Sequence, residues 1–143
     1  MIKLFFWPAF IFSVLLSQGC ALQSEITDES KQYLVQRVEE RWDFLAKRDY
    51  SNAWLFSTPE FRRLFSQDTY YIKFHGMLEY ELTGVQLLAY DADAAVASVA
   101  VRVMISPRPG ASAASLAFGK TSTSIDEKWK RVDDSWYFVD GVR

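Results

Sequence analysis

The chain of 143 residues carries 16 basic and 18 acidic residues, and its formal net charge of −2 argues against a nucleic-acid-binding protein. Half of the residues are hydrophobic and 16% are aromatic, which excludes a disordered tail and predicts one folded domain with a sizeable core. One histidine and one cysteine cannot supply a zinc site or a catalytic triad, so we expect no metal and no cofactor.

Residues 1–19 have the three parts of a secretory signal peptide. Lys3 provides the positive charge, and residues 4–16 form an apolar stretch that leads to small and polar residues. That stretch is shorter than the roughly 20 apolar residues of a membrane-spanning helix, and Pro8 interrupts it. We therefore expect a cleaved signal and no permanent anchor helix.

The signal ends at Cys20, the only cysteine of the chain. The run Leu16-Ser17-Gln18-Gly19-Cys20 resembles the lipobox of bacterial lipoproteins. This resemblance implies cleavage before Cys20, a diacylglycerol on its thiol and an acylated amino group, including fatty acids such as palmitate. Two or more acyl chains hold a protein on a membrane persistently. The alternative is an ordinary signal peptide that happens to end near a cysteine.

Lipidation at Cys20 would make residues 20–26 a lipidated tether and residues 27–143 the folded domain. Ala21 stands where an Asp usually signals retention in the inner membrane, so we expect the periplasmic face of the outer membrane of a Gram-negative cell. A lipidated Cys20 also leaves no thiol for a disulfide, for catalysis or for a metal.

The first half of the domain has helical periodicity. Thr27 is a good N-cap, and the steps of three and four between Leu34, Val38, Trp42 and Leu45 predict an amphipathic helix to about residue 48. A shorter helix is expected to begin at residue 49 or 51. A third follows, with Thr58 as cap and Pro59 as first residue. A fourth should run from residue 66 or 68 to near residue 76.

The second half alternates with a period of two. We predict strands over residues 81–90, 95–105, 116–131 and 136–139, with Gly84 as a bulge. Residues 107–114 should form a loop, and Asp133 and Asp134 a tight turn. Helices followed by an antiparallel meander predict an α+β fold, with the helices packed on a curved sheet of about four strands.

The helical half resembles NTF2-like proteins, which have a cystatin-like fold. The motifs that carry the resemblance are structural: Arg41-Trp42-x-x-Leu45, Lys47-Arg48-Asp49-Tyr50-Ser51-Asn52-Ala53-Trp54, Ser57-Thr58-Pro59-Glu60-Phe61-Arg62, and the terminal Glu127-Lys128-Trp129 with Asp133-Asp134-Ser135-Trp136-Tyr137-Phe138. The resemblance covers roughly residues 27–142 and implies a cone with a pocket between the long helix and a bent sheet. Its superfamily includes isomerases, dehydratases and binding proteins, so the fold does not choose the function.

Six residues are candidates for the lining of that pocket: Trp42, Tyr70, Tyr71, Phe74, Arg102 and Trp129. Aromatic side chains at helical spacing more often belong to a core, and Arg102 more often lies on a solvated sheet face. The single histidine, His75, is either a general base or a helix C-cap, and we favour the cap. No catalytic residue is assigned.

The sequence thus predicts a non-enzymatic, membrane-anchored periplasmic module that binds a partner protein or a small apolar ligand. The alternative is an isomerase or dehydratase with acid–base residues in the cone. A third hypothesis is a subunit of an envelope-spanning assembly. An inward-facing carboxylate opposite a tyrosine would favour the enzyme.

Overall fold

The computed structural model describes residues 25–74, 76 and 78–141. Four helices precede the first strand: α1 (Asp28–Ala46), α2 (Tyr50–Trp54), α3 (Pro59–Leu64) and α4 (Gln67–Phe74). The strands β1 (Leu78–Asp91), β2 (Val96–Pro107), β3 (Thr121–Val132) and β4 (Ser135–Phe138) follow, with a short helix α5 (Ala113–Phe118) between β2 and β3. The predicted α+β class with a four-stranded antiparallel sheet is confirmed.

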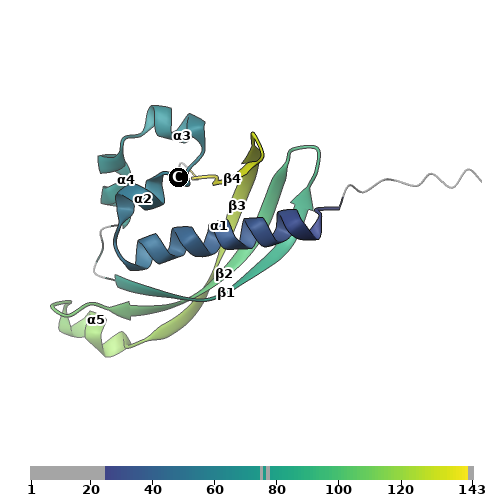
Figure 1. The fold of residues 1–143 in the computed structure, drawn as a ribbon. Coiled ribbons are helices and arrows are strands. Elements are labelled where there is room, and N and C mark those ends of the chain that lie inside the picture. The colour runs from purple at the N-terminus through teal and green to yellow at the C-terminus, as the bar shows by residue number, and fades with distance from the viewer. Residues whose placement is uncertain (1–24, 75, 77, 142–143) are drawn as a thin grey trace, which may run out of the picture.

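The sheet is a simple open meander with the strand order β1-β2-β3-β4. The long helix α1 lies across one face of it, and α2, α3 and α4 gather beyond the C-terminal end of α1 (Figure 1). The β2–β3 ribbon extends past the helical layer on the same side of the view as α2, α3 and α4, but below α1, and carries α5 near its tip. No helix of the described residues is long and apolar enough to cross a membrane.

The predicted helix starts are confirmed by their caps. Thr27 accepts a hydrogen bond from the backbone N–H of Ser30, and Thr58 accepts one from Phe61 with Pro59 in the first turn. Asp49 caps α2 in the same way. These side chains satisfy backbone donors that a helix start leaves without an internal partner.

The strands also confirm the bulge predicted at Gly84. The register between β1 and β2 shifts between Leu82 and Gly84, and again between Leu87 and Ala89. A side chain at Gly84 would approach the guanidinium of Arg102 across the pair to 3.0 Å. Asp133 and Asp134 both have positive φ and turn β3 into β4. A two-residue turn of this kind matches the twist of the strands it joins.

One segment was predicted wrongly. The sequence predicts a loop to residue 114 and a strand from residue 116, but α5 covers both residues 113–114 and residues 116–118. Ser112 caps this helix, its alanines favour a helical backbone, and Gly119 ends it with a φ of 64°. Leu116 and Phe118 are both exposed, so the apolar alternation that predicted a strand has no buried face behind it.

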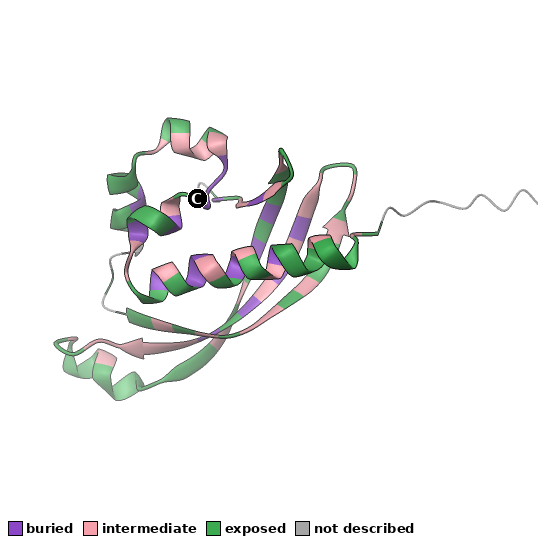
Figure 2. Ribbon diagram, in the orientation of Figure 1, coloured by how far each residue is buried: buried purple, intermediate pink, exposed green. Residues whose placement is uncertain are grey.

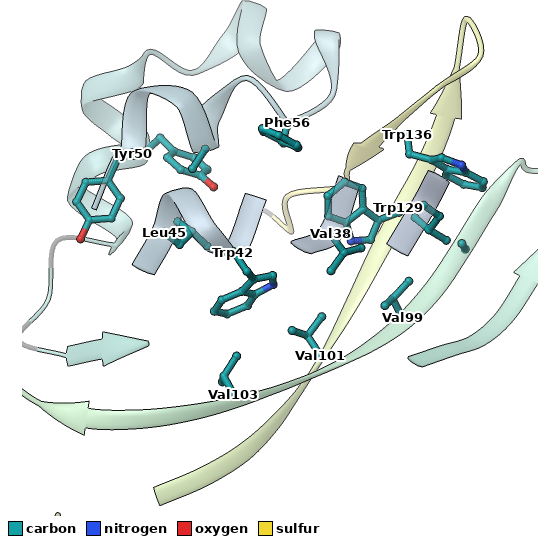
Figure 3. Close-up of a cluster of buried hydrophobic side chains, with 14 residues drawn as sticks. Val38, Trp42, Leu45, Tyr50, Phe56, Val99, Val101, Val103, Trp129 and Trp136 are labelled. Carbon is teal, nitrogen blue, oxygen red and sulfur yellow. The ribbon is translucent and has the colours of Figure 1, made fainter. Parts of the chain in front are cut away.

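The core lies between α1 and the sheet (Figures 2 and 3). The predicted apolar stripe of α1 is buried there and packs against inward-facing residues of the strands: Val99, Val101, Val103, Trp129 and Trp136. The alternate residues point to the other face, where those of β3 up to Lys130 are exposed and those of β2 are half-buried except for the exposed Arg102.

Candidate functional site

A cavity of about 730 Å³ opens between the C-terminal half of α1, the helices α3 and α4, the middle of β3 and the end of β4. Several aromatic side chains form much of its wall: Trp42, Phe61, Phe65, Tyr70 and Phe138. The rest of its lining combines the apolar residues Ile125 and Val139 with polar and charged ones, of which Arg41, Glu127 and Asp140 are the buried charged members. A hollow of about 370 Å³ on the outer side of α1 is lined by α1 residues alone.

Buried in the wall of the cavity is the guanidinium of Arg41, whose side chain is 1% exposed. Its Nη1 donates a hydrogen bond of 2.8 Å to Oε1 of Glu127, which is 4% exposed. Its Nη2 donates one of 3.1 Å to the Tyr70 hydroxyl. The guanidinium also stacks over the ring of Phe138, with 3.8 Å between Cζ and the ring centroid. Together these contacts hold the cation in one place.

Glu127 is held as firmly as its partner. Besides the bond from Arg41, Oε1 accepts a hydrogen bond of 3.1 Å from the indole N–H of Trp42. Oε2 accepts one of 2.9 Å from the indole N–H of Trp129. Three donors on one carboxylate leave it little freedom to move.

The last strand brings Asp140 to the same place. The backbone N–H of Phe138 donates to the carbonyl of Phe56 at 2.7 Å, and that of Thr58 donates to the carbonyl of Phe138 at 3.2 Å. These bonds tie the end of β4 to the segment between α2 and α3. Asp140 follows two residues later, and it is 9% exposed. It therefore lies among the groups that line the cavity.

The buried charges act on one another. Burial would lower the pKa of Arg41, but the combined effect of Tyr70, Glu127 and Asp140 raises the pKa above its usual value. Burial raises the pKa of the Tyr70 phenol, against the opposing effect of Arg41. At neutral pH the site thus holds a fixed cation beside a protonated phenol.

Five of the six residues predicted for the pocket have described side chains, and they divide into three groups. Trp42 and Tyr70 line the cavity. Trp129 is buried beside it and reaches Glu127, while Tyr71 is half exposed and packs edge-on against Tyr50. Arg102 lies exposed on the other face of the sheet, so its assignment to the pocket was wrong and the alternative of a solvated face is correct.

Four predictions concern parts of the chain that the structure does not describe. Phe74 ends α4, but its side chain is outside the described part, as are His75, the lipidation candidate Cys20 and the predicted signal peptide of residues 1–19. Among the described residues, no group of three His, Cys, Asp or Glu side chains is placed to hold a metal ion.

The sequence carried a signal for the charged residues that were missed. Arg41 falls three residues after Val38 and four before Leu45, so it stands on the apolar stripe of α1. Glu127 likewise occupies an inward-facing position of β3, and Asp140 follows the end of β4 by two residues. A charged residue at a position where the periodicity predicts a buried apolar one indicates a buried polar site, because a charge in the interior must be paired with other polar groups.

Comparisons with known proteins add a distant structural neighbour. No family model matches the chain, and no curated protein matches it significantly. Among solved structures, the chain is similar to the solution structure of a SEC-C motif containing protein from Rhodopseudomonas palustris. The two are 16% identical, the match covers 73% of each chain, and the TM-score is 0.48. A likeness of this degree carries no argument about function.

Proposed function

We propose that this chain is a lipid-anchored binding module of the bacterial cell envelope, which holds a small, mainly apolar ligand in the cavity beside Arg41. The cavity carries the proposal. Its volume of about 730 Å³ and its aromatic wall are those of a small-molecule site, since such sites usually have a volume of about 300–1,000 Å³. A few fixed polar groups in an apolar wall orient a ligand.

The finer description of the fold as an NTF2-like cone belongs to the same proposal. It is supported by the resemblance of residues 41–62 and 127–138 and by the position of the cavity between the long helix and the sheet. Attachment through Cys20 at the periplasmic face of the outer membrane follows from the lipobox resemblance.

Binding is favoured over catalysis by the state of Glu127. Its two oxygens already accept three hydrogen bonds, and one of these comes from a buried guanidinium. A general base needs a carboxylate that can take a proton from a substrate within hydrogen-bond reach. Glu127 is better placed to serve as the counter-ion that keeps Arg41 in the wall.

An acid–base alternative is favoured by one observation. Asp140 and Tyr70 line the same cavity, and the charge of Asp140 acts on the Tyr70 phenol. In an isomerase, Asp140 would take a proton from a substrate carbon and return it to another, while Tyr70 would donate a hydrogen bond to the enolate oxygen. Conversion of a β,γ-unsaturated ketone into its conjugated isomer by the full chain, and loss of that activity in Asp140→Asn, would support it.

The binding proposal is tested with the neutral fluorescent probe N-phenyl-1-naphthylamine and the full chain in a maltoside detergent. We expect saturable fluorescence enhancement, and we expect Ile125→Trp to abolish it because the added ring fills the cavity. Leu88→Trp is the matched control, since it adds the same bulk at an exposed position of β1 outside the cavity lining. Equal binding by both variants would reject the cavity as the site.

The anchoring proposal has its own test. Cys20→Ser should abolish metabolic labelling with palmitate and release the protein from the membrane fraction. Unchanged fractionation of this variant would reject lipidation and leave the cavity proposal untouched. Co-purification of the labelled protein with other envelope proteins would instead support a partner-binding role.

A further inference from the structure

Arg62 of α3 lies outside the cavity, beside two aromatic rings. Its Cζ is 5.7 Å from the ring centroid of Trp54 in α2 and 5.8 Å from that of Tyr137 in β4. Both distances are within the range of a cation–π contact, about 6 Å. The indole N–H of Trp54 donates to the carbonyl of Phe65 at 3.1 Å, which fixes one of the two rings. The guanidinium of Arg62 is therefore held in place by its surroundings.

The hydrogen-bonding capacity of Arg62 is not used within the described part of the chain. An arginine carries five N–H donors, and an aromatic ring accepts them only weakly. No described carboxylate forms an ion pair with Arg62, and its Nε is buried without a hydrogen-bond acceptor among the same residues. The buried Arg41, by contrast, has Glu127 as its counter-ion. A partly desolvated cation in this state gains most from an acceptor that comes from outside the chain.

A second cation lies on the other side chain pair of Tyr137. Lys130 is directly opposite Tyr137 in the β3–β4 ladder, so the two side chains leave the sheet on the same face. Lys130 is exposed and, among the described residues, forms no ion pair. The acidic residue of α3, Glu60, stands two positions before Arg62, and helical side chains at that spacing do not face each other. Tyr137 thus has two cations as neighbours, one from α3 and one from β3.

We propose that Arg62 and Lys130 form a binding site for the dianionic phosphate group of a phosphate monoester. The planar guanidinium offers parallel N–H donors that match two phosphate oxygens, and the ammonium adds a second positive charge. A phosphate monoester carries about 1.5–2 negative charges at pH 7, which two cations balance. A carboxylate or a phosphodiester carries only one. The site is separate from the cavity, so the inference does not depend on the ligand proposed there.

Three small anions test the inference on the full chain in a maltoside detergent. Methyl phosphate is the dianion, while dimethyl phosphate and acetate are monoanions. Each is titrated at constant ionic strength and about pH 7.5, above the second phosphate pKa of about 6. Binding is followed by NMR of the isotopically labelled protein, through the Nε–H signal of Arg62 and the indole N–H signal of Trp54. We expect methyl phosphate to shift both signals saturably and to bind about tenfold more tightly than either monoanion.

Two variants locate the site. Arg62→Gln should abolish the saturable shift of the Trp54 indole signal. Arg63→Gln is the matched control, because it removes the same charge from the next, exposed position of α3 and should leave the affinity within about twofold. Lys130→Gln should weaken methyl phosphate about fivefold and bring it close to dimethyl phosphate. If Arg62→Gln does not fold, the order of the three anions and the Lys130 variant still decide.

Three outcomes overturn the inference. They are a response to methyl phosphate that does not saturate, binding of dimethyl phosphate or acetate as tight as that of methyl phosphate, and equal affinities of folded Arg62→Gln and Arg63→Gln. None of them affects the cavity proposal, which is decided by N-phenyl-1-naphthylamine and Ile125→Trp.

Discussion

The two ends of the sheet share the strands β1, β2 and β3 but differ in what covers them. At one end β3 presents Glu127 and Trp129 to α1, where both are buried. At the other end the same strand begins with Thr121 and Ser122, which are exposed, and connects to the exposed helix α5. We call these the cavity end and the ribbon end.

The difference follows from length. A helix of 19 residues spans about 28 Å, whereas a strand of 12 residues spans about 40 Å. The helix therefore cannot cover the whole sheet, and the ribbon end projects past it (Figure 1). Its exposed pairs of β2 and β3 are held by the hydrogen bonds of the ladder. Only the part of the sheet that α1 covers therefore has an interior in which a functional site can form.

The largest expected effect is at the buried ion pair. Glu127→Ala should lower the free energy of unfolding by about 3–5 kcal/mol, because it leaves the Arg41 guanidinium buried without its counter-ion. Chemical denaturation measures the loss. The double variant Arg41→Met/Glu127→Leu should recover most of it, since the buried charges are then both absent. A double variant as unstable as the single one would contradict this account.

Apolar truncation should distinguish the two ends almost as clearly. Leu34→Ala should cost about 2–5 kcal/mol because Leu34 is fully buried against the sheet. Leu116→Ala at the ribbon end should change stability by less than about 0.5 kcal/mol, since this side chain is 52% exposed. Thermal melts of the two variants provide the comparison. A large effect at Leu116 would show that α5 has a covering partner.

Loss of the Tyr70 hydroxyl should cost about 1.5–3 kcal/mol at neutral pH, because a hydrogen bond to the charged Arg41 is lost. Its effect on pH dependence has a defined sign. Since the pKa of Tyr70 is raised in the fold, its contribution is fully present below the usual value of 10.0 and is lost as the pH rises through the folded pKa.

The test compares Tyr70→Phe with Tyr71→Phe, in which the hydroxyl is removed from a side chain that is 50% exposed. Denaturation curves above pH 10 should show a weaker fall of stability for Tyr70→Phe than for the unaltered chain. A fall of the same steepness would contradict the raised pKa.

Helix caps should have smaller effects, and again unequal ones. Thr58→Ala should cost about 1 kcal/mol, because it removes the cap of α3 beside the cavity. Ser112→Ala removes the cap of α5, whose residues are outside the core. It should therefore raise hydrogen exchange in α5 without shifting the global transition.

The smallest effect is expected at the surface ion pair of Asp43 and Lys47. Their atoms are 2.6 Å apart, but the side chains are 55% and 67% exposed. Asp43→Asn should cost no more than about 0.5 kcal/mol, and added salt should remove the difference. A cost close to that of Glu127→Ala would undo the distinction between buried and exposed pairs.

Short-range signals were sufficient for most of the fold. The stripe of α1, the caps at Thr27 and Thr58 and the bulge at Gly84 all depend on neighbours within a few residues, and all are confirmed. The exception is α5, where alternation of Leu116 and Phe118 was mistaken for the face of a strand. An alternating pattern indicates a strand only where one of its two faces is buried. At the ribbon end neither Leu116 nor Phe118 is buried.

The sequence by itself therefore determined the class of the fold and, apart from α5, the order of the elements and the face on which their apolar residues lie, because propensity, capping and periodicity act locally. Only the tertiary structure brought Arg41 to Glu127, which is 86 residues away in the chain, and placed Tyr70 and Asp140 beside them. A charged residue on the apolar face of an element shows that it needs a partner in the interior of the domain. Which partner it finds depends on how the sheet curves against α1, and that is decided by packing across the whole domain.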